Sequence, residues 1–230
     1  MSAERPILFS APMVRALLAG TKTQTRRMVK LRGAEVIKER LRNDPDDNVL
    51  SAESWPWSPP HDRWVSCPYG RPGDRLWVKE TFATLQPTTD AETATTHRDR
   101  VVERPEDGER VALWYRADGE MPLVEQLWAD DEEDGIRWRP SIYMPRWASR
   151  ITLEVTAVRV ERLQAITDAD AKAEGVERNV DDGVEYFGPL NHGHIDPRVA
   201  YRSLWDSING AGSWAANPWV WVVEFKRVTP

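Results

Sequence analysis

The sequence predicts a mixed α+β fold, in which a small β-barrel carries flanking helices and long loop insertions. Three observations lead to this prediction: five or more strand-like segments, helical segments between them, and the lack of a regular βαβ alternation. At 230 residues the chain is long enough to bury a substantial core. We expect a single domain over residues 1–230.

The N-terminal part predicts a strand, a short helix and a second strand. Residues 7–9 (ILF) are apolar and strand-like, and Ser10 is a suitable cap for a helix that ends at Gly20. Residues 23–27 are rich in β-branched threonine, which favours an extended chain. Apolar residues at helical spacing predict a buried helix face of Val14, Leu17 and Leu18.

The middle of the chain alternates between strands and irregular segments. Residues 34–43 predict a charged surface helix, and the proline-rich residues 44–66 predict an irregular loop. Strands are expected at 75–81, after a Pro-Gly-Asp turn, and at 111–115. The polar residues 84–109 predict an exposed insertion. The acidic run at 129–135 is typical of a solvated loop, because consecutive carboxylates do not converge on one ion by themselves.

The C-terminal part predicts two long strands and two helices. Residues 151–160 alternate as a strand does, and Thr167 with Asp170 forms a capping box for a helix through about Val176. A second helix begins near Asp196 and Pro197, with an expected buried face of Val199, Ala200, Leu204 and Ile208. The apolar run at 219–225 (WVWVVEF) predicts a central strand.

Composition restricts the class of protein. The net charge of −6 argues against coating of long nucleic acid, which needs many cationic contacts to phosphate. Residues 1–45 nevertheless carry 10 Lys+Arg against 4 Asp+Glu, which leaves a short anionic ligand open. The lack of a long apolar run predicts a cytoplasmic protein without a membrane partner; protein partners are not indicated. The single cysteine, Cys67, predicts a buried thiol and no disulfide.

The stretch 20–27 (GTKTQTRR) contains a possible nucleophile with its base. A threonine hydroxyl attacks a carbonyl only when a base takes its proton, and a buried lysine amine serves as that base once its pKa falls. A regular strand would point Lys22 and Thr25 to opposite faces, so a bend after Gly20 is required. Glu174, at the end of the predicted helix, is the preferred acidic partner. A solvated cationic strand is the ordinary alternative.

Other residues suit recognition of a nucleobase or phosphate. Arg26 and Arg27 alternate across the strand, so one of them faces any given site. Twelve tryptophans include several in strand-like segments, and one or two suit base stacking. We predict Arg26, Arg27 and Trp77 as substrate-binding residues. The HGH at 192–194 lacks a third ligand, and no metal or other cofactor is expected.

Four segments resemble ASCH domains, relatives of the PUA-like RNA-binding barrels, in the same order. These segments are GTKTQTRR, GDRLWVKE, ITLEV with LQAITDADAKAEGV, and WVWVVEFKR. The longer form, with WRPSIYMPRWASRI, is similar to ASCH proteins of bacteriophages and prophages. The resemblance implies that about 40–70 and 84–135 are insertions into the single domain. The family pattern G-x-K-T-x-T-x-R falls on residues 20–27.

The resemblance implies an activity and a set of residues. Small bacterial ASCH proteins include N4-acetylcytidine amidohydrolases, and their catalytic lysine, threonine and glutamate fall on Lys22, Thr25 and Glu174. We therefore predict hydrolysis of an N4-acylated cytosine nucleoside, or of a related base in a short single strand. Two alternatives stay open, because one fold supports many functions: a non-enzymatic module that binds RNA or modified nucleic acid, and a metal-independent ribonuclease.

Overall fold

The structure is a computed structural model that describes residues 2–30, 49–52, 63–85, 101–119, 137–189 and 193–228. The chain divides into two compact units, each built from segments that are far apart in sequence. Unit 1 comprises Met1–Arg5, Ala16–Leu76 and Leu153–Pro230, and unit 2 comprises Pro6–Arg15 and Trp77–Thr152. The prediction of one domain over residues 1–230 stays a prediction.

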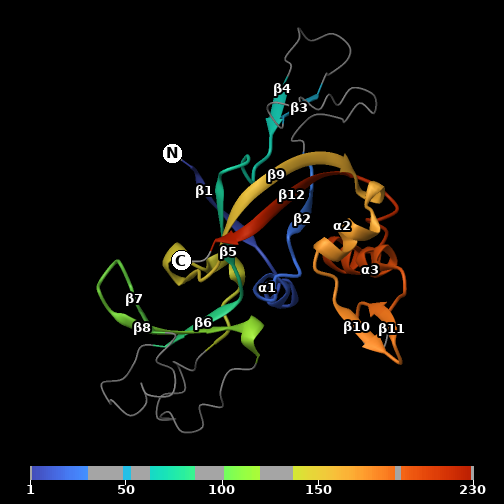
Figure 1. Ribbon diagram of the computed structural model, residues 1–230. Coiled ribbons are helices and arrows are strands. Elements are labelled where there is room, and N and C mark those ends of the chain that lie inside the picture. The colour runs from blue at the N-terminus through green and yellow to red at the C-terminus, as the bar shows by residue number, and fades with distance from the viewer. Residues whose placement is uncertain are drawn as a thin grey trace. The chain divides into compact units, whose positions relative to one another are not determined.

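The described residues form a mixed α+β structure, as predicted (Figure 1). The strands and helices follow one another as β1 (Glu4–Leu8), α1 (Ala11–Leu18), β2 (Gln24–Met28), β3 (Val49–Ala52), β4 (Arg63–Ser66), β5 (Arg75–Lys79), β6 (Phe82–Leu85), β7 (Val101–Glu103), β8 (Arg110–Tyr115), β9 (Thr152–Arg162), α2 (Asp168–Ala173), β10 (Arg178–Asp181), β11 (Val184–Phe187), α3 (Pro197–Asn209) and β12 (Trp219–Val228). Within these residues no helix has the length and apolar character needed to span a membrane.

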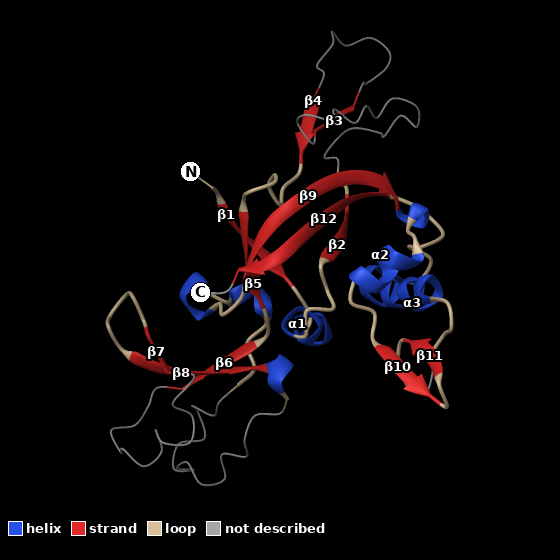
Figure 2. Cartoon of the chain, in the orientation of Figure 1, coloured by secondary structure: helices blue, strands red, loops and turns tan. Residues whose placement is uncertain are grey.

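The largest sheet has five strands in the order β1-β5-β9-β12-β2. The curved strands β9 and β12 are the longest, and they lie side by side (Figure 2). β12 lies inside the sheet, between β9 and β2, and its apolar run is buried as predicted. β2 pairs antiparallel with β12, so that Arg26 stands opposite Val222 and Thr25 opposite Val223.

The predicted barrel is not found in the described part of the chain. Closure would require hydrogen bonds between the first and last strands of one sheet. In the five-stranded sheet, β1 and β2 stand at the two ends of the order. The other sheets hold only two or three strands: β3-β4, β10-β11 and β6-β8-β7.

The proline-rich segment 44–66 contains more regular structure than we predicted. β3 and β4 pair antiparallel within it, from Val49 opposite Ser66 to Ala52 opposite Arg63. Its four prolines lie outside the described residues. The predicted helix at 34–43 and the acidic run at 129–135 lie outside the described residues. The predicted insertions overlap the described chain only at 49–52, 63–70, 84–85 and 101–119.

The helix α2 begins as predicted and ends earlier. Thr167 and Asp170 form a complete capping box, with the Thr167 hydroxyl and the Asp170 carboxylate each bonded to the other's backbone N–H. The last helical residue is Ala173, because Glu174 is the C-cap and Gly175 has a left-handed φ of 80°. This early end places Glu174 at the terminus of the helix.

The helix α3 buries only part of the face that we predicted: Ala200 is buried and Leu204 packs against the core, but Val199 and Ile208 are exposed. Its buried side chains are aromatic or small, whereas Val199 and Ile208 are 39% and 53% exposed. Large aromatic rings bury more area than Val or Ile, so they set which face meets the sheet. The core of unit 1 joins both helices to β12 through Ala171, Ala200, Tyr201, Trp205, Val220 and Val222.

Candidate functional site

The chain turns between α1 and β2. Gly20 has a φ of 74°, which a glycine adopts without strain. The backbone N–H groups of Gly20, Thr21 and Lys22 all donate to carbonyls of Ala16 or Leu17, at 2.9–3.1 Å. These N–H groups therefore close the end of the helix, and they do not supply an oxyanion hole.

The side chain of Lys22 is buried and held at three points. Its ammonium donates to the Gln24 carbonyl at 2.8 Å, to the Glu174 carbonyl at 2.7 Å and to Glu174 Oε2 at 3.2 Å. The backbones of Lys22 and Glu174 also form an isolated antiparallel bridge. Both residues are only 2% exposed. The structure thus brings together two of the three residues predicted as catalytic.

Gly175 allows this close approach. A Cβ added at Gly175 would lie 2.8 Å from Lys22 Cβ and 2.9 Å from Ala16 Cβ, closer than carbon atoms normally approach. The same residue has a left-handed φ. The glycine is therefore required by its backbone conformation and by its contact with Lys22.

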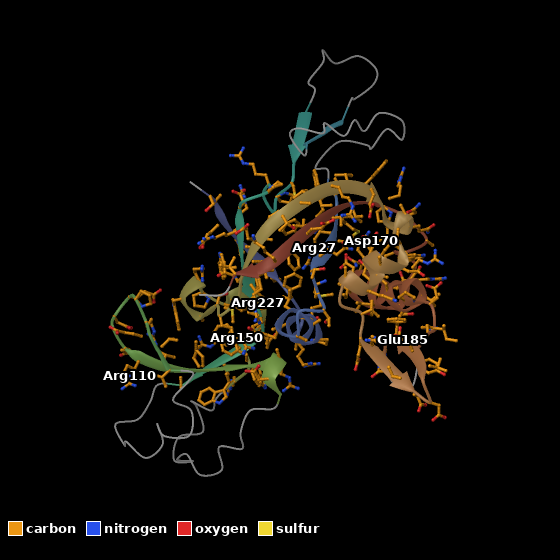
Figure 3. All side chains as sticks on the ribbon, viewed as in Figure 1. Arg27, Arg110, Arg150, Asp170, Glu185 and Arg227 are labelled. Carbon is orange, nitrogen blue, oxygen red and sulfur yellow. The ribbon has the colours of Figure 1, made fainter. Side chains whose placement is uncertain are left out.

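Arg26 lies on the same face of β2 as Gln24 and is surrounded by carboxylates. Its guanidinium pairs with Glu174 Oε1 at 3.1 Å, with Asp170 Oδ2 at 3.3 Å and with Glu161. The Gln24 amide donates to the Asp170 carbonyl at 3.1 Å. Figure 3 shows the side chains between β2 and α2, with Asp170 labelled. Arg26 thus binds carboxylates of its own chain, which favours a positioning role over the predicted contact with substrate.

Glu174 is held between two cations. One carboxylate oxygen accepts a hydrogen bond from Lys22 and the other accepts one from Arg26. A buried carboxylate with partners on both oxygens has a fixed orientation, since each bond restricts its rotation. Arg159 extends the network outward, because it donates to Asp170 at 2.8 Å and to Glu224.

Thr25 lies on the opposite face of β2 from Gln24 and Arg26, since strand side chains alternate. It is 2% exposed. The Gln24 carbonyl that accepts from the Lys22 ammonium belongs to the peptide bond between Gln24 and Thr25. The amine therefore lies beside the backbone that carries the predicted nucleophile.

The other predicted substrate-binding residues lie in different surroundings. Arg27 is partly buried on the Thr25 face of β2, opposite Trp221 (Figure 3). Trp77 belongs to unit 2, where Lys79 and Arg146 lie over its ring. Two other glutamates, each within or next to a strand, also have cationic partners: Glu154 pairs with Lys226 at 2.8 Å, and Glu80 pairs with Arg150 at 2.9 Å.

Burial changes the proton affinity of Lys22. Desolvation is the largest effect, and it lowers the pKa of Lys22 below its ordinary value of 10.5. Glu174 opposes this change, whereas the positive charges of Arg27 and Arg26 reinforce it. Burial also acts against the charge of Arg26, but its carboxylate partners outweigh that effect and raise the pKa of Arg26. Lys22 is therefore the cation in this cluster that releases its proton more readily.

No group of three His, Cys, Asp or Glu side chains in the described part of the chain has the arrangement of a metal site. Cys67 is buried, and desolvation raises the pKa of its thiol to about 11. A thiol with that pKa is a weak nucleophile at neutral pH.

The sequence reasoning missed the partners of Arg26. Glu161 lies near the end of β9 and Asp170 belongs to the capping box of α2, and neither position predicts a contact with Arg26. The sequence contained one relevant signal: in a strand, Gln24, Arg26 and Met28 lie on the same face, so their side chains share one environment. Comparisons with family models, with curated proteins and with solved structures found no match to this chain.

Proposed function

We propose that this chain hydrolyses an N4-acylated cytosine nucleoside, with Lys22 as the base, Thr25 as the nucleophile and Glu174 as the residue that orients Lys22. The observation that carries this proposal is the buried contact between Lys22 and Glu174, with the amine beside the peptide bond of Thr25. The lowered pKa of Lys22 supports its role, because only a neutral amine accepts a proton.

The chemistry follows from these roles. Neutral Lys22 takes the hydroxyl proton of Thr25 as the Thr25 oxygen bonds to the acyl carbon of the substrate. The resulting ammonium, held by Glu174, gives that proton to N4 as the C–N bond breaks. Cytidine leaves, and a water molecule then cleaves the threonine ester to release a carboxylic acid. Glu174 accepts from Lys22 and Arg26 at once, which fits orientation of the amine better than proton donation.

We infer that the fold is of the PUA-like, ASCH type. The order of the resembling segments along the structure supports this inference. Residues 20–27 follow α1 and lead into β2, and GDRLWVKE covers β5. ITLEV leads into β9 before α2, and WVWVVEFKR forms most of β12. All four strands belong to the five-stranded sheet.

The test compares two threonines that are two residues apart. Purified full chain is incubated with N4-acetylcytidine, and cytidine release is followed by chromatography. Thr25→Ala should lower kcat by about a thousandfold or more, because the nucleophile is lost. Thr23→Ala is the matched control, since Thr23 is exposed, and it should retain turnover. Absence of turnover by the wild type, or full turnover by Thr25→Ala, would overturn the proposal.

A further inference from the structure

A long segment of unit 2, residues 139–151, lies against the end of β5 and the start of β6. We call residues 139–151 the strap. Its first residue, Arg139, exchanges two backbone hydrogen bonds with Phe82, at 2.7 and 3.2 Å. Its last residue, Ile151, accepts a hydrogen bond from the backbone N–H of Val78 at 3.0 Å. Both ends of the strap are therefore fixed to one short stretch of chain.

The strap packs against the three-stranded sheet β6-β8-β7. Two strap residues and three sheet residues form one buried cluster: Met144, Ala148, Phe82, Leu113 and Tyr115. The Tyr115 hydroxyl also donates to the Ala148 carbonyl at 2.9 Å. Opening of the strap would expose these apolar side chains to water, so the packing favours the closed strap.

Arg150 gives the strap an ionic contact with two other elements (Figure 3). Its guanidinium binds both oxygens of Glu80, at 2.9 and 3.1 Å, and both oxygens of Asp118, at 3.0 and 2.9 Å. The same guanidinium lies 4.0 Å from the centroid of the Tyr115 ring. Arg150 thus joins the strap to the residue that follows β5 and to the 3-10 turn Arg116–Asp118.

Glu80 is the most buried member of this ionic group. Its side chain is 1% exposed, against 25% for Arg150 and 21% for Asp118. Burial disfavours the charged form of a carboxyl group, and a second carboxylate nearby does the same. Both effects act on Glu80, and together they outweigh the attraction of the Arg150 guanidinium. Desolvation is the largest cause, and the pKa of Glu80 rises above its ordinary value of 4.5.

The other elements packed around Glu80 present groups that are bonded elsewhere or carry no charge. From the strap, the Met144 sulfur accepts a hydrogen bond from the backbone N–H of Glu80 at 3.4 Å. From β8, the Tyr115 hydroxyl donates to the strap backbone. From α1, Arg15 donates to a backbone carbonyl of the turn after β8 at 3.4 Å, and from β5, the Lys79 ammonium donates to a strap carbonyl.

We propose that Glu80 is a proton switch that holds the strap more tightly closed in mildly acidic solution than at neutral pH. When the strap opens, Arg150 leaves with it and water reaches the Glu80 carboxyl group, which then regains its ordinary pKa of 4.5. Between this value and the raised one, the closed strap binds more protons than the open strap. A rise in pH through that interval therefore favours opening.

The dependence ends above the raised pKa, because Glu80 is then charged in both states. The switch does not rest on the proposed hydrolysis, since none of its residues belongs to the cluster around Lys22 and Glu174.

The test follows amide hydrogen exchange of the strap in the full chain by mass spectrometry, from about pH 4.5 to about pH 8. After division by the intrinsic exchange rate, the protection of strap peptides should fall as the pH rises, by at most about tenfold per pH unit, which is the limit for one proton. Glu80→Gln has no titratable group at this position, so the protection of its strap should stay constant with pH. Circular dichroism verifies that each variant is folded.

A second variant tests the switch even if Glu80→Gln does not fold. Asp118→Asn removes the like charge beside Glu80, so the fall in protection should end at a lower pH than in the wild type. Glu154→Gln, which alters a glutamate of unit 1 paired with Lys226, is the matched control and should reproduce the wild-type curve.

The proposal is overturned if the protection of the wild-type strap is constant or increases as the pH rises. It is also overturned if the folded variants Glu80→Gln and Asp118→Asn both keep the wild-type dependence on pH, because the titrating group would then lie elsewhere.

Discussion

The ammonium of Lys22 lies 3.2 Å from Oε2 of Glu174, although 152 residues separate the two along the chain. Both side chains are buried, so their charges interact in a medium that screens little. Buried pairs of this kind gain little net stability, because desolvation opposes their attraction. Removal of one partner leaves the other as a buried charge without compensation, which is costly. Four predictions test the contacts of this pair.

Glu174→Gln should destabilise the fold strongly. The change removes the carboxylate that faces both Lys22 and Arg26, and it leaves two buried cations with less compensation. We expect a loss of about 3–5 kcal/mol in the free energy of unfolding, measured by urea denaturation. Glu185→Gln, which breaks the exposed pair with Arg178, is the control, and its effect should be under about 1 kcal/mol. Equal effects would show that the burial of Glu174 is energetically irrelevant.

Gly175→Ala should cost more than Gly183→Ala. The two glycines have nearly the same left-handed φ, 80° and 79°, so each substitution carries a backbone penalty of about 1–2 kcal/mol. A Cβ at Gly175 would collide with Lys22 and Ala16, whereas nothing lies within 4 Å of one at Gly183. We expect an additional loss of about 1–3 kcal/mol for Gly175→Ala in thermal or urea unfolding. The same loss in both variants would contradict the close approach of Gly175 to Lys22.

The stability contributed by Lys22 should rise with pH. Burial lowers the pKa of Lys22 in the folded chain, whereas the unfolded chain keeps the ordinary value of 10.5. Between these two values the unfolded state binds more protons, so raising the pH favours the folded state. The free energy of unfolding of the wild type, relative to that of Lys22→Met, should therefore increase as the pH approaches 10.5. If the free energies of unfolding of the wild type and of Lys22→Met changed with pH in parallel, the pKa of Lys22 would be the same in the folded and unfolded chain.

Arg26→Lys should impair catalysis through Glu174. A lysine keeps the charge but cannot contact Glu174, Asp170 and Glu161 at once, so the carboxylate loses its fixed orientation. We expect kcat for N4-acetylcytidine to fall by about tenfold to a hundredfold. The value of KM should change little, because the partners of Arg26 are carboxylates of the protein itself and not groups of the substrate.

The control for Arg26→Lys is Arg198→Lys, which alters an exposed arginine paired with Asp168 and Asp196. It should leave both kinetic constants unchanged. A rise in KM for Arg26→Lys at constant kcat would instead support the direct substrate contact that we first predicted for Arg26.

The sequence by itself determined several local features of unit 1. The capping box of Thr167 and Asp170 fixed the start of α2, and the apolar run at 219–225 fixed an interior strand. These signals act over a few residues, through caps, turns and side-chain periodicity, so they can be read without knowing the fold. The choice of Lys22, Thr25 and Glu174 combined chemical reasoning with a family resemblance, and their catalytic roles remain a proposal.

Only the tertiary structure decided which side chains meet. The sequence suggested that Val199 and Ile208 were buried in α3, but packing of aromatic rings turned those residues outward. It also could not show that Arg26 meets three carboxylates, since Glu161, Asp170 and Glu174 come from separate positions more than a hundred residues away. Contacts at such separations depend on how helices settle on a sheet, and this is set by the summed burial of many side chains rather than by any short motif.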